Sequence, residues 1–598
     1  MESRIAIVGG GPKGIYGLER LTAELKITAP RRESVEIHLF NRTPFFGSGD
    51  IYRTDQPDYL LMNFSNGHVD MWSRGAPAPV VSPALGFSDW LDARNFPGVS
   101  SDPRSYSPRS VTGAYLTDGF KAISDACPDH ITLHTHVAEV TGLRSVGTGF
   151  ALETSSDNVN QRVRDSPFHW ILVCTGHPRH APDAEILGLQ QFAQAHPGVH
   201  YVNFVYPVAE KLHSIRPDSN VAIKGLGLTF IDAVLALTEG RGGTFAAGQQ
   251  GRLRYVPSGR EPAVLFPFSR SGLTMIPRGV TYGLPRRPLN YFNAPNVPQV
   301  GPVDFDLQIW PLIQRDMMFA YYEILFQNHG LRLRPDRDHA RLTGEIERFH
   351  SDHPGTHRFD PVELLQPFDQ RENLHDHTLD FMRRATAGAE QGELKSPLSA
   401  AAAVWRHATP LFSEIYRCGG LTAASHRSFL STYAGHLNRL AFGPPVVNMQ
   451  KVIAVAEAGL LDFSFARNPA VRTDPVAGRF TLHHAGNPGI TQRCEVLIDA
   501  RIPKTFLQAD ASPLYRALIK AGHVRAFSNA GFEPGCVDID PAGNAIGIGG
   551  CPNDRLTFYG TPTEGVTWDN DTLSRSHNDF ASGWARRVAR DLPKAIAS

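Results

Sequence analysis

The sequence predicts an α/β protein with two parallel-sheet domains and a largely helical insertion. Three observations support this: a glycine turn between strand and helix patterns at the N-terminus, a second such turn near residue 225, and helical periodicity after residue 281. We expect residues 1–205 and 451–598 to form the two parts of a first domain, residues 206–280 a second domain, and residues 281–450 the helical insertion.

The composition excludes several function classes. The 598 residues carry 59 Lys and Arg against 59 Asp and Glu, so the chain has no basic excess for general nucleic-acid binding. No apolar run reaches the roughly 18 residues that span a bilayer, and the first strand begins too early to leave room for a signal peptide. We therefore expect a cytoplasmic protein that binds neither membranes nor nucleic acid, and we leave a homodimer open.

The cysteines and histidines show no pattern of a metal or disulfide centre. The six cysteines include no CxxC pair, which argues against a redox-active disulfide and against a cysteine zinc site. His375 and His377 have no further partner at metal-ligand spacing. We expect reduced cysteines and no bound metal.

The first glycine turn is a dinucleotide-binding motif in complete context. The apolar run Ile5–Val8 predicts a strand and Val35–Phe40 predicts the next one, with an amphipathic helix between them. In the turn, Gly9 permits the sharp bend, Gly11 lets the backbone approach a pyrophosphate, and Gly14 lets the helix pack on the strand. The helix N-terminus would then face the phosphates. A purely structural turn is the weaker alternative.

One position departs from this motif. The acidic residue that usually ends the second strand and binds the ribose is absent, and Asn41 stands there. An amide can still hydrogen-bond hydroxyl groups. We expect a weaker ribose contact because the amide carries no full charge.

The second turn lacks the third glycine. Gly225 and Gly227 follow the strand pattern at 221–224, but Phe230 takes the third position. A second dinucleotide is the favoured interpretation, and a packed strand–helix junction is the alternative. Further on, Arg270 stands between two serines at an expected strand end, which suits a 2′-phosphate and favours NADP over NAD. Arg270 could also be an ordinary solvated arginine.

The remaining segments complete the outline. Residues 43–110 are rich in glycine and proline and too long for a simple connection, which is typical of a functional loop. Strands are expected at 131–134 and 170–174, and helices within 308–326. Strand patterns return at 494–500 and 556–560.

Several motifs resemble the flavoproteins with two dinucleotide-binding domains. The N-terminal stretch IAIVGGGPKGIYGLERL carries the resemblance, and further segments extend it over most of the chain: Phe46–Gly49 to Met62–Asn63, Tyr106–Arg109 through Tyr115–Leu116, Cys174–Gly176, Gly225–Thr229 with Asp232, Phe442–Pro445 and Gly560–Gly565. The resemblance implies two Rossmann-like domains, with FAD on the first turn and NADPH on the second. A flavin also explains why no Ser/His/Asp or Cys/His constellation stands out.

Within that class, the chain is similar to the flavin-dependent N-monooxygenases of natural-product pathways. Among them, it most resembles those that oxidise the amine of L-aspartate to nitrosuccinate. This similarity implies an enzyme that uses NADPH and O2 to oxidise the amine of a small amino acid, for example in antibiotic biosynthesis. Two departures set it apart from other branches: the fingerprint of Baeyer–Villiger enzymes is missing, and Val173–His177 replaces the FATGY segment of ornithine hydroxylases.

The resemblance also implies the binding residues. The expected FAD set is Gly9, Gly11, Pro12, Gly14, Asn41, Asn63, Arg109, Val137, Gly176 and Thr563. The expected NADPH set is Gly225, Gly227, Leu228, Thr229 and Arg270. For Arg109, a structural ion pair is an equally good interpretation.

A dicarboxylic amino acid would require cations in its pocket, preferably arginines. The candidates in the insertion are Arg286, Arg287 and Arg439, although most arginines of this segment must be solvated. Two other functions stay open: a reductase or dehydrogenase that passes electrons to another acceptor, and a non-catalytic FAD-binding or redox-sensing protein. The missing cysteine pairs weaken the disulfide-reductase version of the first function. For the second function, two dinucleotide sites would be more than such a protein requires.

Overall fold

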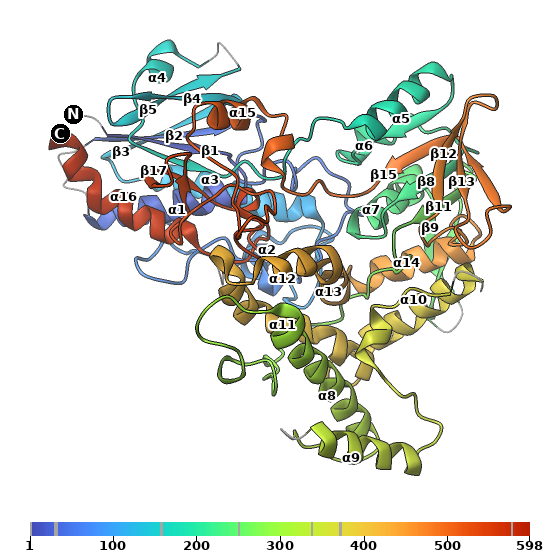
Figure 1. Ribbon diagram of the computed structural model, residues 1–598. Coiled ribbons are helices and arrows are strands. Elements are labelled where there is room, and N and C mark those ends of the chain that lie inside the picture. The colour runs from blue at the N-terminus through green and yellow to red at the C-terminus, as the bar shows by residue number, and fades with distance from the viewer. Residues whose placement is uncertain are drawn as a thin grey trace.

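The computed structural model describes residues 3–28, 34–155, 159–248, 251–335, 339–369, 373–575 and 578–597. Two parallel sheets form the upper part of the molecule, and a helical part lies below and between them (Figure 1). The predicted fold class is confirmed: strand–turn–helix units build both sheets, and helices dominate the third part.

The first sheet has six strands around a fully buried core. In spatial order they are β16 (Asn544–Ile546), β17 (Pro552–Phe558), β6 (Trp170–Val173), β1 (Ser3–Val8), β2 (Val35–Asn41) and β3 (Ile131–Val137). All neighbouring pairs are parallel except β16 with β17. Since β1 has strands on both sides, its carboxyl end lies at the centre of the sheet edge, where open α/β sheets bind ligands.

Helices from both ends of the chain cover this sheet. α1 (Pro12–Thr28) follows β1 directly, and α16 (Phe580–Ala597) packs along it (Figure 1). Further elements of this part are α2 (Phe87–Arg94), α3 (Arg109–Asp125), the hairpin β4 (Val140–Val146) and β5 (Gly149–Thr154), α4 (Gln161–Asp165) and α15 (Pro513–Lys520).

The second sheet has four parallel strands. In order they are β11 (Val264–Phe268), β8 (Asn220–Lys224), β15 (Val496–Asp499) and β7 (His200–Val202). Around it lie α5 (Ala184–Ala195), α6 (Val208–Lys211), α7 (Leu228–Leu237), the pair β9 (Thr244–Ala247) and β10 (Leu253–Val256), and the antiparallel strands β12 (Ala470–Asp474), β13 (Arg479–His483) and β14 (Thr491–Cys494).

The helical part joins the two sheets. Its helices are α8 (Trp310–Asn328), α9 (His339–Asp352), α10 (Leu374–Gln391), α11 (Pro397–Tyr416), α12 (Ala423–Ser428), α13 (Ala434–Ala441) and α14 (Val446–Glu457). α8 packs along α11, where buried Ala400–Ala403 permit a close approach, and Trp405 and Phe412 fill the core. At its far side, α14 packs on α7 and β10 of the second domain.

The strand pairing differs from the expected domain boundaries. Residues 470–499 lie in the range expected to complete the first domain, but β15 pairs with β8 and β7 in the second sheet. β7 likewise lies in the second sheet, although residues up to 205 were expected in the first domain. A short apolar strand shows no preference for either sheet, which is why its periodicity could not place it. We propose that the second domain comprises residues 200–280 and about 460–500.

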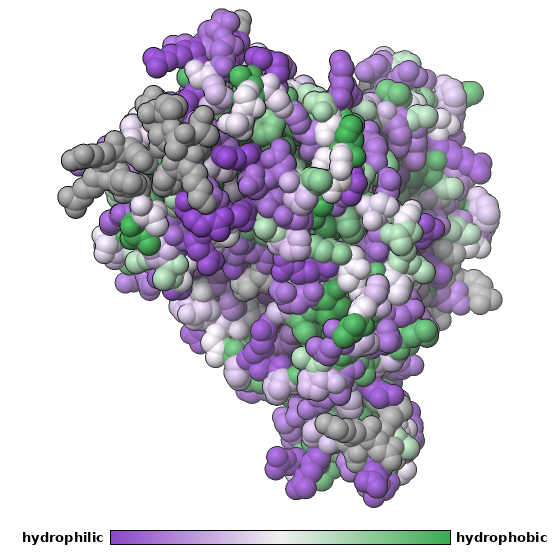
Figure 2. Space-filling model, turned by 60° about the vertical axis from the view of Figure 1, so that its left-hand side comes forward, coloured by the Kyte–Doolittle hydropathy of each residue, from purple (hydrophilic) through white to green (hydrophobic). Residues whose placement is uncertain are grey.

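The surface shows no single dominant apolar region on the face in Figure 2, where hydrophobic residues form small groups among hydrophilic ones. In the described residues, no helix combines the length and apolar composition needed to cross a bilayer. The six cysteines form no disulfide with one another.

Candidate active site

The first glycine turn has the shape that a pyrophosphate requires. A Cβ on Gly9 would lie 2.2 Å from the Cys174 carbonyl oxygen, and one on Gly14 would lie 1.9 Å from the Gly9 oxygen, so packing demands glycine at both positions. Gly9 also adopts a φ of 112°. At Gly11, in contrast, a Cβ would make only an ordinary 3.6 Å contact with the Gly49 Cα. The Gly11 position thus leaves room beside the N-terminus of α1.

Asn41 holds this turn in place. Its Oδ1 accepts a hydrogen bond from the Gly10 N–H at 3.1 Å, and its Nδ2 donates to the carbonyl oxygens of Thr43 at 2.9 Å and Phe45 at 3.3 Å. The expected role was a ribose contact. The structure shows that the amide is already used by the backbone on both sides, which explains why an amide, with both donor and acceptor, suits this position.

Buried charged groups lie beyond the turn. Lys13 Nζ donates to the Ser574 carbonyl oxygen at 3.3 Å and lies 4.7 Å from the centre of the Tyr559 ring. Burial lowers the pKa of Lys13 to about 8, although Asp569 and Asp571 act in the opposite direction. Desolvated cations beside a glycine turn fit a polyphosphate, so the residues present fit the diphosphate of FAD.

Three other expected FAD residues lie around the same sheet edge. Val137 ends β3 beside Asn41 and is half exposed. Gly176, with a φ of 73°, has open space where a side chain would be. Thr563 is fully buried, and its hydroxyl bonds to Gly560, Thr567 and Asn570, so it supports the loop rather than facing a ligand by its side chain.

Arg109 and Asn63 connect parts of the protein. Arg109 Nη1 lies 2.7 Å from Asp232 Oδ2, and both side chains are largely buried. The structural ion pair considered for Arg109 is therefore present. Asn63 Nδ2 donates to the Phe442 carbonyl oxygen at 3.2 Å, which links the long loop of the first domain to the helical part.

The second turn resembles the first in its backbone but is more open. Gly225 adopts a φ of 128°, and its N–H donates to the Phe268 oxygen at 2.7 Å. No atom lies within 4 Å of a Cβ built on Gly227, and Leu228 and Thr229 begin α7 immediately after it. This open N-terminus fits the diphosphate of a second dinucleotide.

Arg270 follows β11 at the same edge of the second sheet. It is exposed and makes no ion pair with any residue that the structure describes. Burial and the nearby charge of Arg270 lower the pKa of Lys504, so a second cation lies close to it. Lys504 follows β15, and its place beside Arg270 depends on the strand pairing that the sequence did not reveal.

The three arginines expected to bind substrate have different surroundings. Arg287 forms an ion pair with Glu323. Arg439 is buried and donates to the carbonyl oxygens of Thr274 and Leu364. Only Arg286 lines the main cavity. The structure therefore places Arg287 and Arg439 away from that cavity, because neighbouring groups already hold their guanidinium groups.

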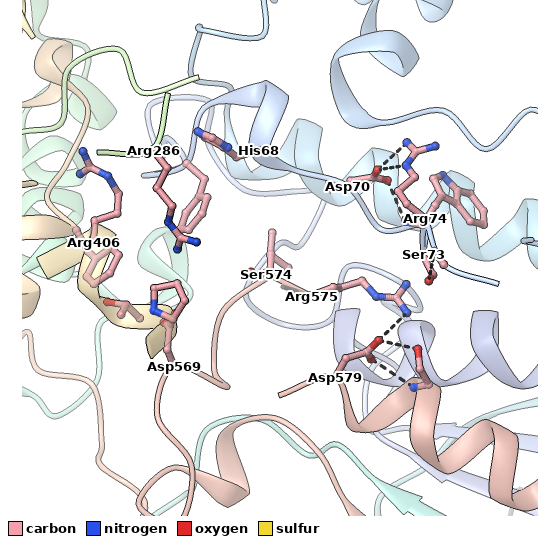
Figure 3. A pocket seen from close by; sticks show the side chains of 18 of the residues that line it. His68, Asp70, Ser73, Arg74, Arg286, Arg406, Asp569, Ser574, Arg575 and Asp579 are labelled. Carbon is pink, nitrogen blue, oxygen red and sulfur yellow. Dashed lines mark hydrogen bonds and ion pairs between the residues drawn. The ribbon is translucent and has the colours of Figure 1, made fainter. Parts of the chain in front are cut away.

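The main cavity lies between the first domain and the helical part and has a volume of about 740 Å³. Figure 3 shows His68, Arg286 and Arg406 on one side and the pairs Asp70–Arg74 and Arg575–Asp579 on the other. Its wall adjoins the first glycine turn, because Ser574 contacts Lys13 and the Leu573 oxygen accepts from the Tyr16 hydroxyl. The cavity-lining residues with polar or charged side chains are His68, Asp70, Ser73, Arg74, Arg278, Arg286, Arg406, Thr409, Asp569, Ser574, Arg575, Asp579, Ser582 and Arg586.

Of these residues, sequence reasoning named only Arg286, and three of those it missed stand out. Arg278 lies just before the expected insertion, Arg406 lies within α11, and His68 lies in the long loop. Burial, together with the charges of Arg278 and Arg406, lowers the pKa of His68, so its imidazole is neutral near pH 7. The helical periodicity around Arg406 was readable, but no local pattern shows that the three meet.

A group of histidines on the first sheet has an internal explanation. Glu36, His38 and His134 offer ligand atoms within 4.8 Å of one another. However, Glu36 is paired with Arg4 at 2.9 Å, and His38 lies 3.3 Å from Glu36 and 3.0 Å from His136. These contacts account for the group as a hydrogen-bonded chain.

Known proteins resemble this chain over nearly its full length. A family model described as FAD-NAD(P)-binding matches residues 6–178. Nitrosuccinic acid synthase npaA of Aspergillus oryzae is 30% identical over 95% of this chain and 89% of its own length. L-aspartate N-monooxygenase (nitrosuccinate-forming) of Streptomyces cremeus is 30% identical over 94% of this chain and 90% of its own length.

Two further matches have lower sequence identity. The enzyme of the same name from Streptomyces davaonensis is 28% identical over 94% of this chain and 93% of its own length. The solved ornithine N-hydroxylase of Kutzneria sp. 744 aligns over the whole of both chains with 12% identity and a TM-score of 0.48. On the full-length sequence identity, this chain belongs to the FAD- and NADPH-dependent N-monooxygenase family that includes the nitrosuccinate-forming L-aspartate N-monooxygenases.

Proposed function

We propose that this enzyme oxidises the amine of L-aspartate to nitrosuccinate with NADPH and O2. The observation that supports this substrate most directly is the charge of the cavity: six arginines and three aspartates line it. Two of the aspartates, Asp70 and Asp579, are paired with arginines of the same wall. The excess positive charge therefore suits an anionic substrate.

The protein residues would bind and orient the substrate. The first turn would hold FAD with Gly9, Gly11, Gly14 and Lys13, and the second would hold NADPH with Gly225, Gly227 and Arg270. Bound FAD, reduced by NADPH, supplies the oxygen-transfer chemistry. The cavity beside the first turn would hold the substrate amine next to that centre and limit access of water.

The cavity also favours the reactive protonation state of the amine. Only an unprotonated amine has the lone pair that attacks an electrophilic oxygen. Burial, together with the charges of Arg278 and Arg406, lowers the pKa of His68, and these two arginines disfavour a further positive charge nearby. They would lower the pKa of a bound ammonium in the same way, and the neutral imidazole of His68 would accept its proton.

Aerobic turnover with an amine panel tests this function. NADPH consumption should depend on L-aspartate, and mass spectrometry should detect nitrosuccinate. NADPH consumption that is independent of every amine and depends on an added electron acceptor would instead identify a reductase or dehydrogenase. The cytoplasmic location and the homodimer remain predictions of the sequence.

A further inference from the structure

We propose that two carboxylates on α8, Asp316 and Glu323, are positioning residues for the reaction. They anchor loop 281–293, which contributes to the main cavity, and thereby keep the cavity in its substrate-binding shape. None of the described residues of α8 lines the cavity itself, so the two carboxylates act through the loop. The inference rests on the proposed function, because its kinetic test uses the substrate proposed above.

Loop 281–293 runs from the first domain to the core of the helical part. At its beginning, the Thr281 hydroxyl lies 3.3 Å from His68 Nε2. At its end, Phe292 is buried in the core of the helical part and is 1% exposed. Between the two ends, Arg286 is exposed and lines the cavity (Figure 3). The place of two cavity residues, His68 and Arg286, therefore depends on where this loop lies.

The loop has little internal support. Residues 281–293 contain neither a helix nor a strand. Pro285 and Pro288 flank Arg286 and Arg287 and restrict the backbone there, but a proline has no N–H to donate to a hydrogen bond. Side chains from other elements must therefore satisfy the buried N–H groups of the loop and hold it in place.

Asp316 accepts hydrogen bonds from three consecutive backbone N–H groups of the loop. Its Oδ1 accepts from Asn290 at 2.8 Å and from Tyr291 at 3.2 Å, and its Oδ2 accepts from Phe292 at 2.7 Å. Asp316 is 2% exposed, so water does not compete for these donors. Burial raises the pKa of Asp316 to about 6, although the three N–H groups and the charge of Arg287 act in the opposite direction. The side chain is thus a carboxylate near pH 7, and its hydrogen bonds are charge-assisted.

Glu323 holds the same loop at a second point. It forms an ion pair with Arg287, the residue that directly follows Arg286. Asp316 and Glu323 are seven residues apart, about two helical turns, and therefore lie on the same face of α8. α8 in turn packs along α11 in the core of the helical part. The two carboxylates together form the anchor of the loop, and they attach it to a well-packed helix.

The anchor determines which fraction of the molecules has a cavity ready for substrate. With the anchor intact, Arg286 is held next to a fixed neighbour, and without it the loop samples other positions. Substrate then binds only to the fraction of molecules with the loop in place, so the apparent affinity falls in proportion to that fraction. Once substrate is bound, the loop is in place again and the bound complex turns over as before. The anchor should therefore act on KM and leave kcat nearly unchanged.

The test combines hydrogen–deuterium exchange of the FAD-loaded enzyme with steady-state kinetics on L-aspartate. In Asp316→Asn, the amide oxygen can still accept, but its NH2 group opposes the remaining N–H donors. Peptides from residues 285–293 should exchange at least about tenfold faster, and KM should rise about tenfold while kcat changes less than about twofold. Glu323→Gln should change exchange and KM in the same direction by a smaller factor, because its ion pair is partly exposed.

Asp304→Asn is the matched control. Asp304 also belongs to the helical part and accepts a backbone N–H, from Leu307 at 3.0 Å, but it neither lines the cavity nor contacts the loop by a hydrogen bond among the described residues. This variant should keep the wild-type KM and the wild-type exchange of residues 285–293. An equal rise of KM in Asp304→Asn and Asp316→Asn would overturn the inference.

Two further results would overturn it. Unchanged exchange of the loop in Asp316→Asn would contradict the anchor, and faster exchange with an unchanged KM would contradict its effect on the cavity. If Asp316→Asn does not fold, Glu323→Gln decides by the same two measurements. The proposed function can fail separately: faster loop exchange in an enzyme that never oxidises L-aspartate would contradict the reaction and leave the anchor standing.

Discussion

Arg109 at the start of α3 and Asp232 on α7 form an ion pair of 2.7 Å that ties the first domain to the helix after the second glycine turn. The Tyr206 hydroxyl contacts both side chains. A fixed distance between the two glycine turns would also fix the distance between the two bound cofactors. We therefore interpret this ion pair as the contact that holds the two cofactor sites at a fixed distance.

Removal of one partner should therefore destabilise the protein. Asp232→Asn leaves the Arg109 charge buried without its counterion, and we expect a loss of about 3 kcal/mol in the free energy of unfolding. Chemical denaturation measures it. Asp380→Asn is the matched control, because Asp380 pairs with Arg383 on the surface and should cost less than about 1 kcal/mol. Equal losses of unfolding free energy in the two variants would contradict this role of the Arg109–Asp232 ion pair.

The first turn predicts opposite outcomes for two alanine substitutions. Gly14→Ala places a Cβ 1.9 Å from the Gly9 oxygen and should lower stability by about 2 to 4 kcal/mol even without FAD. Gly11→Ala meets only the Gly49 Cα at 3.6 Å, so the apoprotein should melt as the wild type does. Its FAD affinity should nevertheless fall at least about tenfold, because the methyl group occupies the pyrophosphate's place. Melting curves and flavin titration of both apoproteins distinguish the two effects.

Replacement of Asn41 by aspartate, an acidic residue of the kind usual at this position, should destabilise the protein. Asn41→Asp brings a carboxylate against the carbonyl oxygens of Thr43 and Phe45, which now accept from Nδ2. We expect a loss of about 1 to 3 kcal/mol, the cost of unsatisfied and opposed polar groups. Thermal melts measure it, with Asn553→Asp as the comparison, because the partly exposed Asn553 only accepts a hydrogen bond, from the Arg555 N–H, and an aspartate can keep it. A stabilised variant with tighter FAD binding would show that Asn41 contacts the ribose after all.

Acid should destabilise the protein through its buried histidines. His426 accepts or donates at 2.6 Å to the Tyr416 hydroxyl, and burial lowers its pKa to about 4. The unfolded chain binds this proton below its ordinary pKa of 6.5, and the folded chain does so only near 4. The contribution is thus complete above pH 6.5 and is lost as the pH falls towards 4.

His426→Phe measures this contribution. The free energy of unfolding of the wild type should fall more steeply between pH 6.5 and 4, by up to about 1.4 kcal/mol per pH unit. The difference in slope, not in stability, is the readout, because the variant also leaves Tyr416 without its partner. Parallel curves over this range would contradict a neutral buried imidazole.

The sequence could predict those features whose interacting residues lie close together along the chain, and not those whose residues lie far apart. Gly9, Gly11 and Gly14 were readable because strand, turn and helix are consecutive, and the structure builds the motif as expected. β15 pairs within the second sheet, and its sequence does not reveal this because three apolar residues followed by an aspartate fit either sheet. Arg278 and Arg406 line the same cavity although they lie far apart in the sequence, and no local pattern encodes that proximity.

Arg287 and Arg439 do not line the cavity, and both have the same kind of physical reason. Arg287 and Arg439 are arginines in the expected segment, but Glu323 and two backbone carbonyl oxygens already satisfy them. A sequence gives the charge of a side chain and not the neighbour that neutralises it. Only the structure shows which cation remains available to a ligand.

The most direct test of the proposed function is turnover of ¹⁵N-labelled L-aspartate with NADPH under ¹⁸O2. Our account predicts that NADPH oxidation accelerates with aspartate and that the product is nitrosuccinate, with ¹⁵N retained and ¹⁸O bound to it. Recovery of the ¹⁵N-aspartate unoxidised and without ¹⁸O after complete NADPH consumption, with the electrons on another acceptor, would contradict it.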